Sequence, residues 1–206
     1  VTNMESMFSN SAFNYDISSW DVSKVTNMKS MFYHSPLNQY IGGWNVSNVT
    51  NMRAMFSHAE SFNQDIRKWD VSKVTDMTIM FSGAVKFNQN LDSWNVSSVM
   101  KMGSMFEGAT AFNGSINSWD VSRVQNMSSM FRGARAFNQP LDKWGTKISS
   151  VTTMSSMFEC ALSFNQDVTK WDMKKVHSID KMFYLARKYS KIPSSWQPTY
   201  VVNTCN

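Results

Sequence analysis

The position of the tryptophans constrains the fold of this chain more than any other feature. All eight fall in one column of a repeating pattern, 24 to 27 residues apart. They are Trp20, Trp44, Trp69, Trp94, Trp119, Trp144, Trp171 and Trp196. A fixed period of this length is typical of repeat proteins, in which each unit buries its apolar face only against its neighbours. We therefore expect one elongated domain over residues 1–206.

The first half of each repeat has the pattern of a short strand. In I-x-x-W-[DN]-V, as at Ile17, Trp20 and Val22, the tryptophan and valine are expected to point inward and the polar residues outward. Stacked repeats would then place these strands side by side in one parallel sheet.

The second half, S-x-V-x-x-M-x-x-M-F, has the pattern of a short helix. Val25, Met28, Met31 and Phe32 lie at i, i+3, i+6 and i+7, which predicts an amphipathic helix of about two turns. The column two residues after the phenylalanine predicts a left-handed helix end. It holds Asn10, His34, His58, Gly83, Gly108, Gly133 and Cys160. The predicted fold class is therefore an α/β solenoid.

The two ends of the array differ from its middle. Residues 1–16 match only part of a repeat, and we expect either a longer precursor or a trimmed chain as the reason. Residues 176–206 have prolines in and after the strand column, at Pro193 and Pro198, which favours a C-terminal capping repeat.

Asparagine recurs at the turn back to the strand. Stacking brings these side chains to about 5 Å from one another, close enough to bond the backbone of the neighbouring turn. We expect a structural asparagine ladder through Asn14, Asn38, Asn63, Asn88, Asn113, Asn138 and Asn165.

The charge distribution bears on the partner. The net charge is +5, and residues 170–206 carry seven basic and two acidic side chains while the rest of the chain is balanced. Nucleic-acid-binding proteins spread lysine and arginine along one face with stacking aromatics, whereas the aromatic residues here belong to apolar columns. We expect no nucleic-acid partner and a basic C-terminal cap. No apolar run approaches the ~20 residues of a membrane span, so we expect no membrane insertion.

The two cysteines leave two interpretations open. Cys160 and Cys205 either form one bridge, which suits an oxidising compartment, or remain free buried thiols. Five N-x-S/T sequons give weak support for secretion because the chain is rich in asparagine and serine. They begin at Asn45, Asn48, Asn95, Asn113 and Asn126.

One family shares the whole repeat motif. W-[DN]-V-S-x-V-[TS]-x-M-x-x-M-F-x-x-A-x-x-F-N-[QG], as in residues 69–89, resembles the BspA-like leucine-rich-repeat surface proteins over nearly the whole chain. The resemblance is strongest to the branch of that family with Met-Phe and Trp-Asp-Val repeats. There I-x-x-W-x-V takes the place of L-x-x-L-x-L in ordinary leucine-rich repeats, so the resemblance implies a leucine-rich-repeat-like solenoid. It also implies an extracellular or cell-surface interaction protein without known enzymatic activity. It carries over no binding residue.

Candidate ligand contacts are the polar residues that flank the tryptophan column on the face opposite to its side chain, predicted to be concave. Their variety on a constant scaffold is typical of a recognition surface, and also of unconstrained solvent exposure. The Asp or Asn after each tryptophan has an alternative role in capping the following element. The predicted contacts are Arg67, Lys68, Asp70, Asn95, Asp120, Lys143, Lys170 and Asp172.

The remaining chemistry favours binding over catalysis. Fifteen of the 17 methionines lie in the two apolar columns of the predicted helix, so they are interpreted as core. The chain has no phosphate-binding loop, zinc spacing or nucleophile signature, and we expect no enzyme activity, metal or cofactor. The prediction is an adhesion module for a protein or glycan. The alternative is a spacer or subunit that contacts upstream repeats or other assembly subunits.

Overall fold

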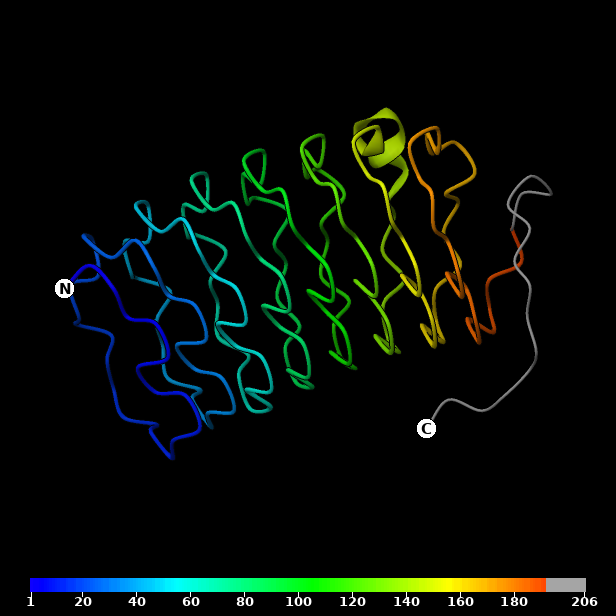
Figure 1. Ribbon diagram of the computed structural model, residues 1–206. Coiled ribbons are helices and arrows are strands. Elements are labelled where there is room, and N and C mark those ends of the chain that lie inside the picture. Colours follow the sequence, from blue (N-terminus) through cyan, green and yellow to red (C-terminus); the bar gives the residue numbers. More distant parts are fainter. Residues whose placement is uncertain (192–206) are drawn as a thin grey trace.

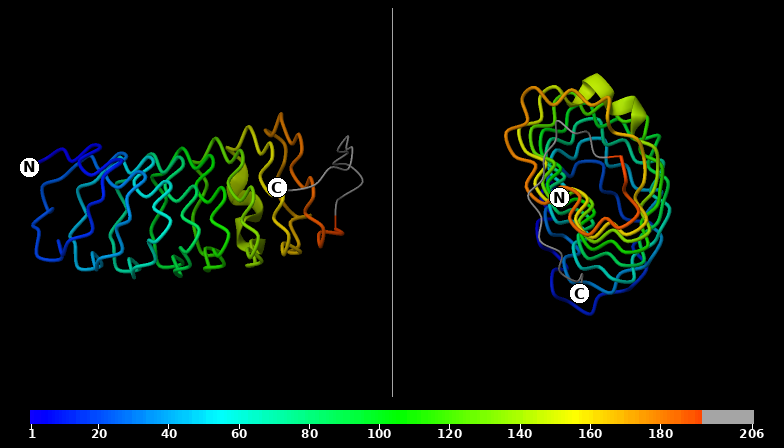
Figure 2. Two further views of the ribbon diagram at one scale, coloured as in Figure 1. Left: turned by 90° about the horizontal axis from the view of Figure 1, so that it is seen from below. Right: turned by 90° about the vertical axis from the view of Figure 1, so that its right-hand side faces the viewer.

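The computed structural model describes residues 1–191. Each repeat forms one circuit of the chain, which we call a rung, and successive rungs stack side by side along one axis (Figure 1). Seen along that axis, the rungs superpose on an oval outline (Figure 2). Equivalent residues of neighbouring repeats therefore lie beside one another.

Parallel β-bridges join neighbouring rungs at one column of the repeat. The bridged residues are Asn3, Asn27, Asn51, Asp76, Lys101, Asn126, Thr153 and Ser178, each paired with the next. Beyond the bridge, every second N–H group from Met77 to Gly83 donates to a carbonyl between Lys101 and Glu107, at N···O distances of 2.7 to 3.0 Å. We call this part of each repeat, residues 76–83 and their equivalents, the ladder wall.

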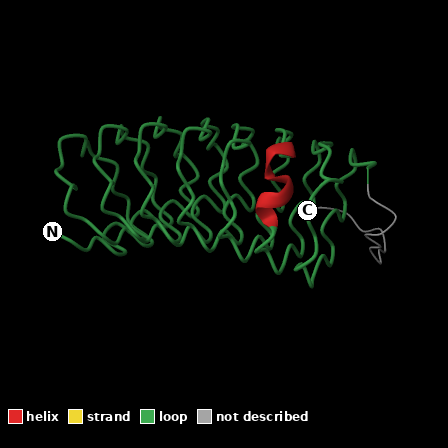
Figure 3. Cartoon of the chain, turned by 90° about the horizontal axis from the view of Figure 1, so that it is seen from above, coloured by secondary structure: helices red, strands yellow, loops and turns green. Residues whose placement is uncertain are grey.

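The helix expected in each repeat is not found in the described residues, so that prediction is corrected. The one helical element there is the 3-10 helix η1, Asp142–Ile148, where the turn is longer than in other repeats (Figure 3). The ladder wall instead consists of β-turns, closed for example by Met80 N–H donating to Met77 O at 3.2 Å. Apolar residues spaced by three mark the ends of a β-turn as well as one side of a helix, which is why the pattern misled.

Left-handed residues make these turns possible and prevent a helix. The column expected to end the helix does have positive φ, as at His58 (55°) and Gly83 (70°), but the residues belong to turns. A second left-handed column, with Ser104 at 55°, lies four residues earlier in the repeat. This column cannot be recognised from residue type, because serine is its commonest occupant and no glycine occurs in it.

The expected strand is also replaced by turns in the described residues. Trp69 N–H donates to Ile66 O at 3.1 Å, and Val74 N–H donates to Val71 O at 2.9 Å. Parallel pairing between repeats is present, but it has moved from the I-x-x-W-x-V segment to the ladder wall. The α/β composition predicted for each repeat is therefore not observed in residues 1–191.

One continuous core fills the stack. Trp119 and Trp144 are fully buried, which confirms the inward orientation of the tryptophan column. Along the axis, the phenylalanine rings from Phe32 to Phe183 stack with centroids 5.5 to 5.7 Å apart. The indole N–H of Trp119 donates to the Leu91 carbonyl of the preceding rung at 2.8 Å, so the polar atom of the buried ring is satisfied.

Asparagine side chains form a second line of bonds between rungs. The Oδ1 atom of each asparagine from Asn14 to Asn138 accepts the backbone N–H of the next asparagine, at 2.8 to 3.0 Å. The line ends at Asn165, whose buried Oδ1 has no hydrogen-bond partner in the part of the chain that the structure describes. In the next rung Tyr189 and Ser190 replace the Phe-Asn pair.

Several predictions concern residues beyond the described range. The capping segment 176–206 is described only to residue 191, and Pro193, Pro198 and Trp196 lie outside it. Cys160 is disulfide-bonded, so it is not a free thiol. Its predicted partner Cys205 lies outside the described residues, and that pairing stays a prediction.

Candidate functional site

The variable residues of the repeat lie on a series of two-residue turns, each followed by a tryptophan, which we call the Ile-to-Trp turns. They are residues 18–19, 42–43, 67–68, 92–93, 117–118 and 169–170, and η1 takes the equivalent place after Leu141. In the third of these turns, the backbone N–H bonds close within the repeat: Asp65 Oδ1 accepts the Arg67 N–H at 3.0 Å and Ile66 O accepts the Trp69 N–H. Side chains of the next rung add two bonds, from Trp94 Nε1 to Ile66 O at 3.1 Å and from Ser93 Oγ to Arg67 O at 2.8 Å. The side chains at the tip are therefore free to vary.

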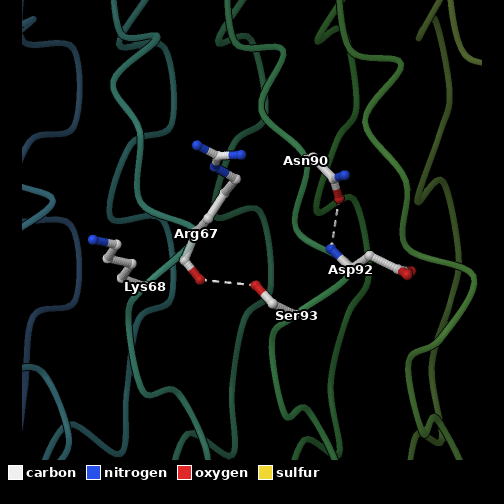
Figure 4. Close-up of a pocket in the computed structure, with 5 residues that line it drawn as sticks. All are labelled: Arg67, Lys68, Asn90, Asp92 and Ser93. Carbon is white, nitrogen blue, oxygen red and sulfur yellow. Dashed lines mark hydrogen bonds between the residues drawn. The ribbon is translucent and has the colours of Figure 1, made fainter.

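Two of the predicted contacts come together in an open depression of about 680 Å³. Arg67 and Lys68 line it from one rung, and Asn90, Asp92 and Ser93 line it from the next (Figure 4). Ser93 Oγ donates to the Arg67 carbonyl at 2.8 Å, and the Asp92 N–H donates to Asn90 Oδ1 at 2.9 Å. The first bond joins the two rungs beneath the depression, and the second closes a turn within one rung.

Arg67 is held by an ion pair beside its own backbone. Its Nε donates to Asp65 Oδ1 at 3.0 Å and its Nη2 donates to Asp65 Oδ2 at 2.8 Å. These side-chain bonds, followed by the backbone N–H of Arg67, lower the pKa of Asp65 to about 2. The two-bond geometry fixes the guanidinium plane while leaving the side chain largely exposed.

Lys68 is the unpaired cation of the depression. It is exposed, and its ammonium makes no hydrogen bond or ion pair with any residue of the described range. Figure 4 shows its side chain directed away from Asn90 and Asp92, toward the earlier rungs. An ammonium in this position is available to an anionic group of a ligand.

The acidic and amide residues after the tryptophans serve the scaffold first. The Oδ1 atom of each accepts the backbone N–H two residues further along, at 3.0 to 3.2 Å. These residues are Asp70, Asn95, Asp120 and Asp172. Hydrogen bonding by the Ser72 side chain and then its backbone N–H lowers the pKa of Asp70. Capping was the alternative role considered for this column, although the capped element is a turn and not a helix.

The other predicted contacts lie elsewhere along the stack. Lys143 lies in η1, and its backbone N–H donates to Asn117 Oδ1 at 3.1 Å. Lys170 is exposed on the turn formed by residues 169–170. Neither is among the residues lining the depression. Asn90, Asp92 and Ser93 were missed as site residues, although the Asp92–Ser93 pair belongs to the variable column, because their contact with Arg67 depends on the register of the rungs.

The histidine pair on the opposite side of the repeat is a separate feature. The rings of His34 and His58 stack at 4.5 Å with an interplanar angle of 1°, beside a smaller depression that Glu60 also lines. Across residues 1–191, no group of three or more His, Cys, Asp or Glu side chains is arranged to hold a metal ion. Within the same range, no helix has the length and apolar character to cross a bilayer.

One family model matches three overlapping segments of the chain, residues 1–84, 64–149 and 114–206, and is described as Mycoplasma protein of unknown function, DUF285. The chain belongs to this family. The three DUF285 matches together span the array, as expected for a repeat protein, and residues 67 and 68 fall in the overlap of the first two. No curated protein matches the chain. The DUF285 description assigns no function, so the functional argument rests on the geometry above.

Proposed function

We propose that this chain is a non-enzymatic binding module, extracellular or on a cell surface, which recognises a protein or glycan through its Ile-to-Trp turns. One observation carries the proposal: residues that differ between repeats line a depression on a stack whose other columns are nearly constant. Arg67 and Lys68 supply charge there, and Asn90 and Ser93 supply neutral polar groups. A small number of placed polar groups on a rigid support is typical of binding sites.

The fold proposal is a solenoid related to the BspA-like branch of the leucine-rich-repeat surface proteins. The repeat motif and the regular parallel pairing between rungs support it. The family match to a Mycoplasma repeat protein is compatible with it. A disulfide-bonded Cys160 fits an oxidising environment such as the outside of a cell.

A spacer or assembly subunit is the second candidate. The bridge column runs without interruption from Asn3 to Ser178, which would make the array a stiff rod. In that role the Ile-to-Trp turns would be no more than a solvated surface, and the basic C-terminal residues would hold the partner.

Two sets of charge changes separate these candidates. The first reverses the charges of Arg67, Lys68, Lys143 and Lys170, and the second neutralises Lys174, Lys175, Arg187 and Lys188. Binding to arrays of purified extracellular-matrix proteins and glycans is measured for both variants, with near-ultraviolet circular dichroism as a check on folding. We expect the first set to abolish binding and the second to leave it unchanged. Binding that survives the first set and is lost with the second would overturn the proposal.

A further inference from the structure

Tyr40 stands at a position where other repeats have a residue that accepts a backbone hydrogen bond from the Ile-to-Trp turn. Two residues before the Ile-to-Trp turn, Asp16 and Asp65 accept the turn's backbone N–H at 2.9 and 3.0 Å. A tyrosine has no carboxylate for this bond. Its side chain is instead 53% exposed, one of four large hydrophobic residues that are exposed among residues 1–191.

The glycines of the same turn make room for the Tyr40 ring. A Cβ atom added at Gly42 would lie 2.8 Å from Tyr40 Cε2, and one added at Gly43 would lie 3.8 Å from Cε1. A side chain at position 42 is excluded by a second contact as well, because the same Cβ would collide with the carbonyl oxygen of Asp65 in the next rung. The ring therefore lies along a turn that has no side chains of its own, and about half of the residue remains exposed.

The Tyr40 ring lies over a turn of the rung that precedes Arg67 and Lys68. The contact between Gly42 and Asp65 places the Gly42–Gly43 turn directly beside the rung that carries Arg67 and Lys68. Lys68 extends toward the side of the earlier rungs (Figure 4), where Gly43 has no side chain to pair with it. A half-exposed aromatic ring, a guanidinium held by Asp65 and a lysine ammonium that makes no hydrogen bond within residues 1–191 thus lie on adjacent turns.

From this arrangement we propose that Tyr40, Arg67 and Lys68 form a subsite for a sugar ring that carries a carboxylate. The inference rests on the proposed function of the same face and narrows its ligand to an acidic glycan. One side of a pyranose ring presents C–H groups, which pack on an aromatic ring, and its hydroxyls accept and donate hydrogen bonds around the edge. The carboxylate would form a charge-assisted bond with the Lys68 ammonium, which has no partner to give up.

Other residues fit this orientation. Asn90 and Ser93 place polar side chains on the far side of Arg67 from the tyrosine, within reach of a second sugar unit along the depression. The carboxylate of Asp92 is occupied, because the Ser118 N–H and Oγ–H donate to its two oxygens at 2.8 Å each. These bonds stabilise its ionised form, so the carboxylate of the sugar would lie toward Lys68 and not toward Asp92.

The test uses the full chain and two probes, the acidic trisaccharide 3′-sialyllactose and its neutral parent disaccharide lactose, in calorimetric titrations. We expect the acidic probe to bind at least about tenfold more tightly than lactose, a difference that corresponds to about 1.4 kcal/mol. Tyr40→Ala should weaken binding of the acidic probe by about tenfold or more, whereas Tyr40→Phe should keep it within about twofold, since the ring face remains. Lys68→Ala should remove the preference for the acidic probe.

The control is Tyr15→Ala, which removes a tyrosine that is 74% exposed on an earlier rung and should leave binding unchanged. Gly43→Glu adds a carboxylate where there is space for one, and should abolish binding of the acidic probe without unfolding the chain. Equal binding by wild type and Tyr40→Ala, or no binding of the acidic probe at millimolar concentration, would overturn the inference. In that case the variant with reversed charges at Arg67, Lys68, Lys143 and Lys170 decides what remains. If that variant no longer binds a protein ligand that the wild-type chain binds, the proposed function stands and only the acidic-glycan assignment fails.

Discussion

The ladder wall and the Ile-to-Trp turns differ in where their hydrogen bonds go. In the wall, the N–H groups of Ile79 and Phe81 donate to the next rung, so each residue supports a neighbouring repeat. In the turn at Arg67, the bonds from Asp65 and to Ile66 close within one repeat. The comparison shows how the two regions differ: backbone groups join neighbouring rungs in the wall, whereas at the turns a side chain such as that of Ser93 makes the link, and this side chain can change from repeat to repeat.

The largest expected effect is in the core that both regions share. Trp119→Ala should lower the free energy of unfolding by about 3 to 5 kcal/mol, because it empties the site of a fully buried ring and removes the indole donor to the Leu91 carbonyl, which keeps only its bond from the Trp94 N–H. Urea unfolding followed by circular dichroism measures this. The control Lys68→Ala, at an exposed turn tip, should stay within about 0.5 kcal/mol. Similar losses for both would remove the distinction between scaffold and turn.

Glycine substitutions compare the two regions directly. Gly108→Ala in the wall places an L-residue at a φ of 68° and should cost about 1 to 2 kcal/mol. Gly43→Ala in a turn should change stability by less than about 0.5 kcal/mol, since its Cβ would make only an ordinary contact with Tyr40 at 3.8 Å. The same unfolding measurement applies. An equal cost at both positions would show that backbone strain does not separate the regions.

The asparagine line should give an intermediate effect. Asn138→Ala removes the acceptor for the Asn165 N–H and for Gln166 Nε2, each bonded at 2.9 Å, and should cost about 1 kcal/mol. Asn138→Asp keeps an oxygen at the same place and should recover part of that loss. A fully stable alanine variant would count against a structural role for this column.

The smallest expected effect is at the turn carrying the candidate site. The pKa of Asp65 is about 2 in the folded chain, below the ordinary value of about 3.9, because of its bonds with Arg67. A lowered folded pKa stabilises the fold above the ordinary value, and that contribution is lost as pH falls from about 4 toward 2. In Arg67→Ala the pKa should rise toward the ordinary value. Carboxyl-carbon NMR titration measures both, and an unchanged pKa in the variant would exclude the ion pair.

The sequence was sufficient to predict the period of the repeat and the inward orientation of its apolar columns. The period follows from Trp20 to Trp171 recurring at nearly constant spacing, and burial follows from their type. The sequence pattern did not distinguish β-turns from a helix, since Met77 and Met80 have the same spacing in both. The residue that decides between them is Ile79, whose φ is positive, and an isoleucine side chain does not predict that conformation.

The candidate site could be predicted only in part, for a related reason. Arg67 and Lys68 were identified because they stand out in a variable column. Their neighbours Asn90 and Ser93 depend on which residues the rung register brings together. Tyr40 was missed because its exposure results from the glycines beside it and the Asp65 carbonyl of the next rung, and neither contact can be read from one repeat.

The central claim is that the Met-x-x-Met-Phe segment is a wall of turns bonded between repeats and not a row of helices. Scalar coupling across a hydrogen bond, measured by NMR on the isotope-labelled chain, tests this at Phe106. Its N–H donates to the Met130 carbonyl of the next rung at 2.9 Å, so the account predicts a coupling between Phe106 nitrogen and Met130 carbonyl carbon. In an α-helix the same N–H would bond to the carbonyl four residues earlier, at Met102. A coupling to Met102 in place of Met130 would contradict the account.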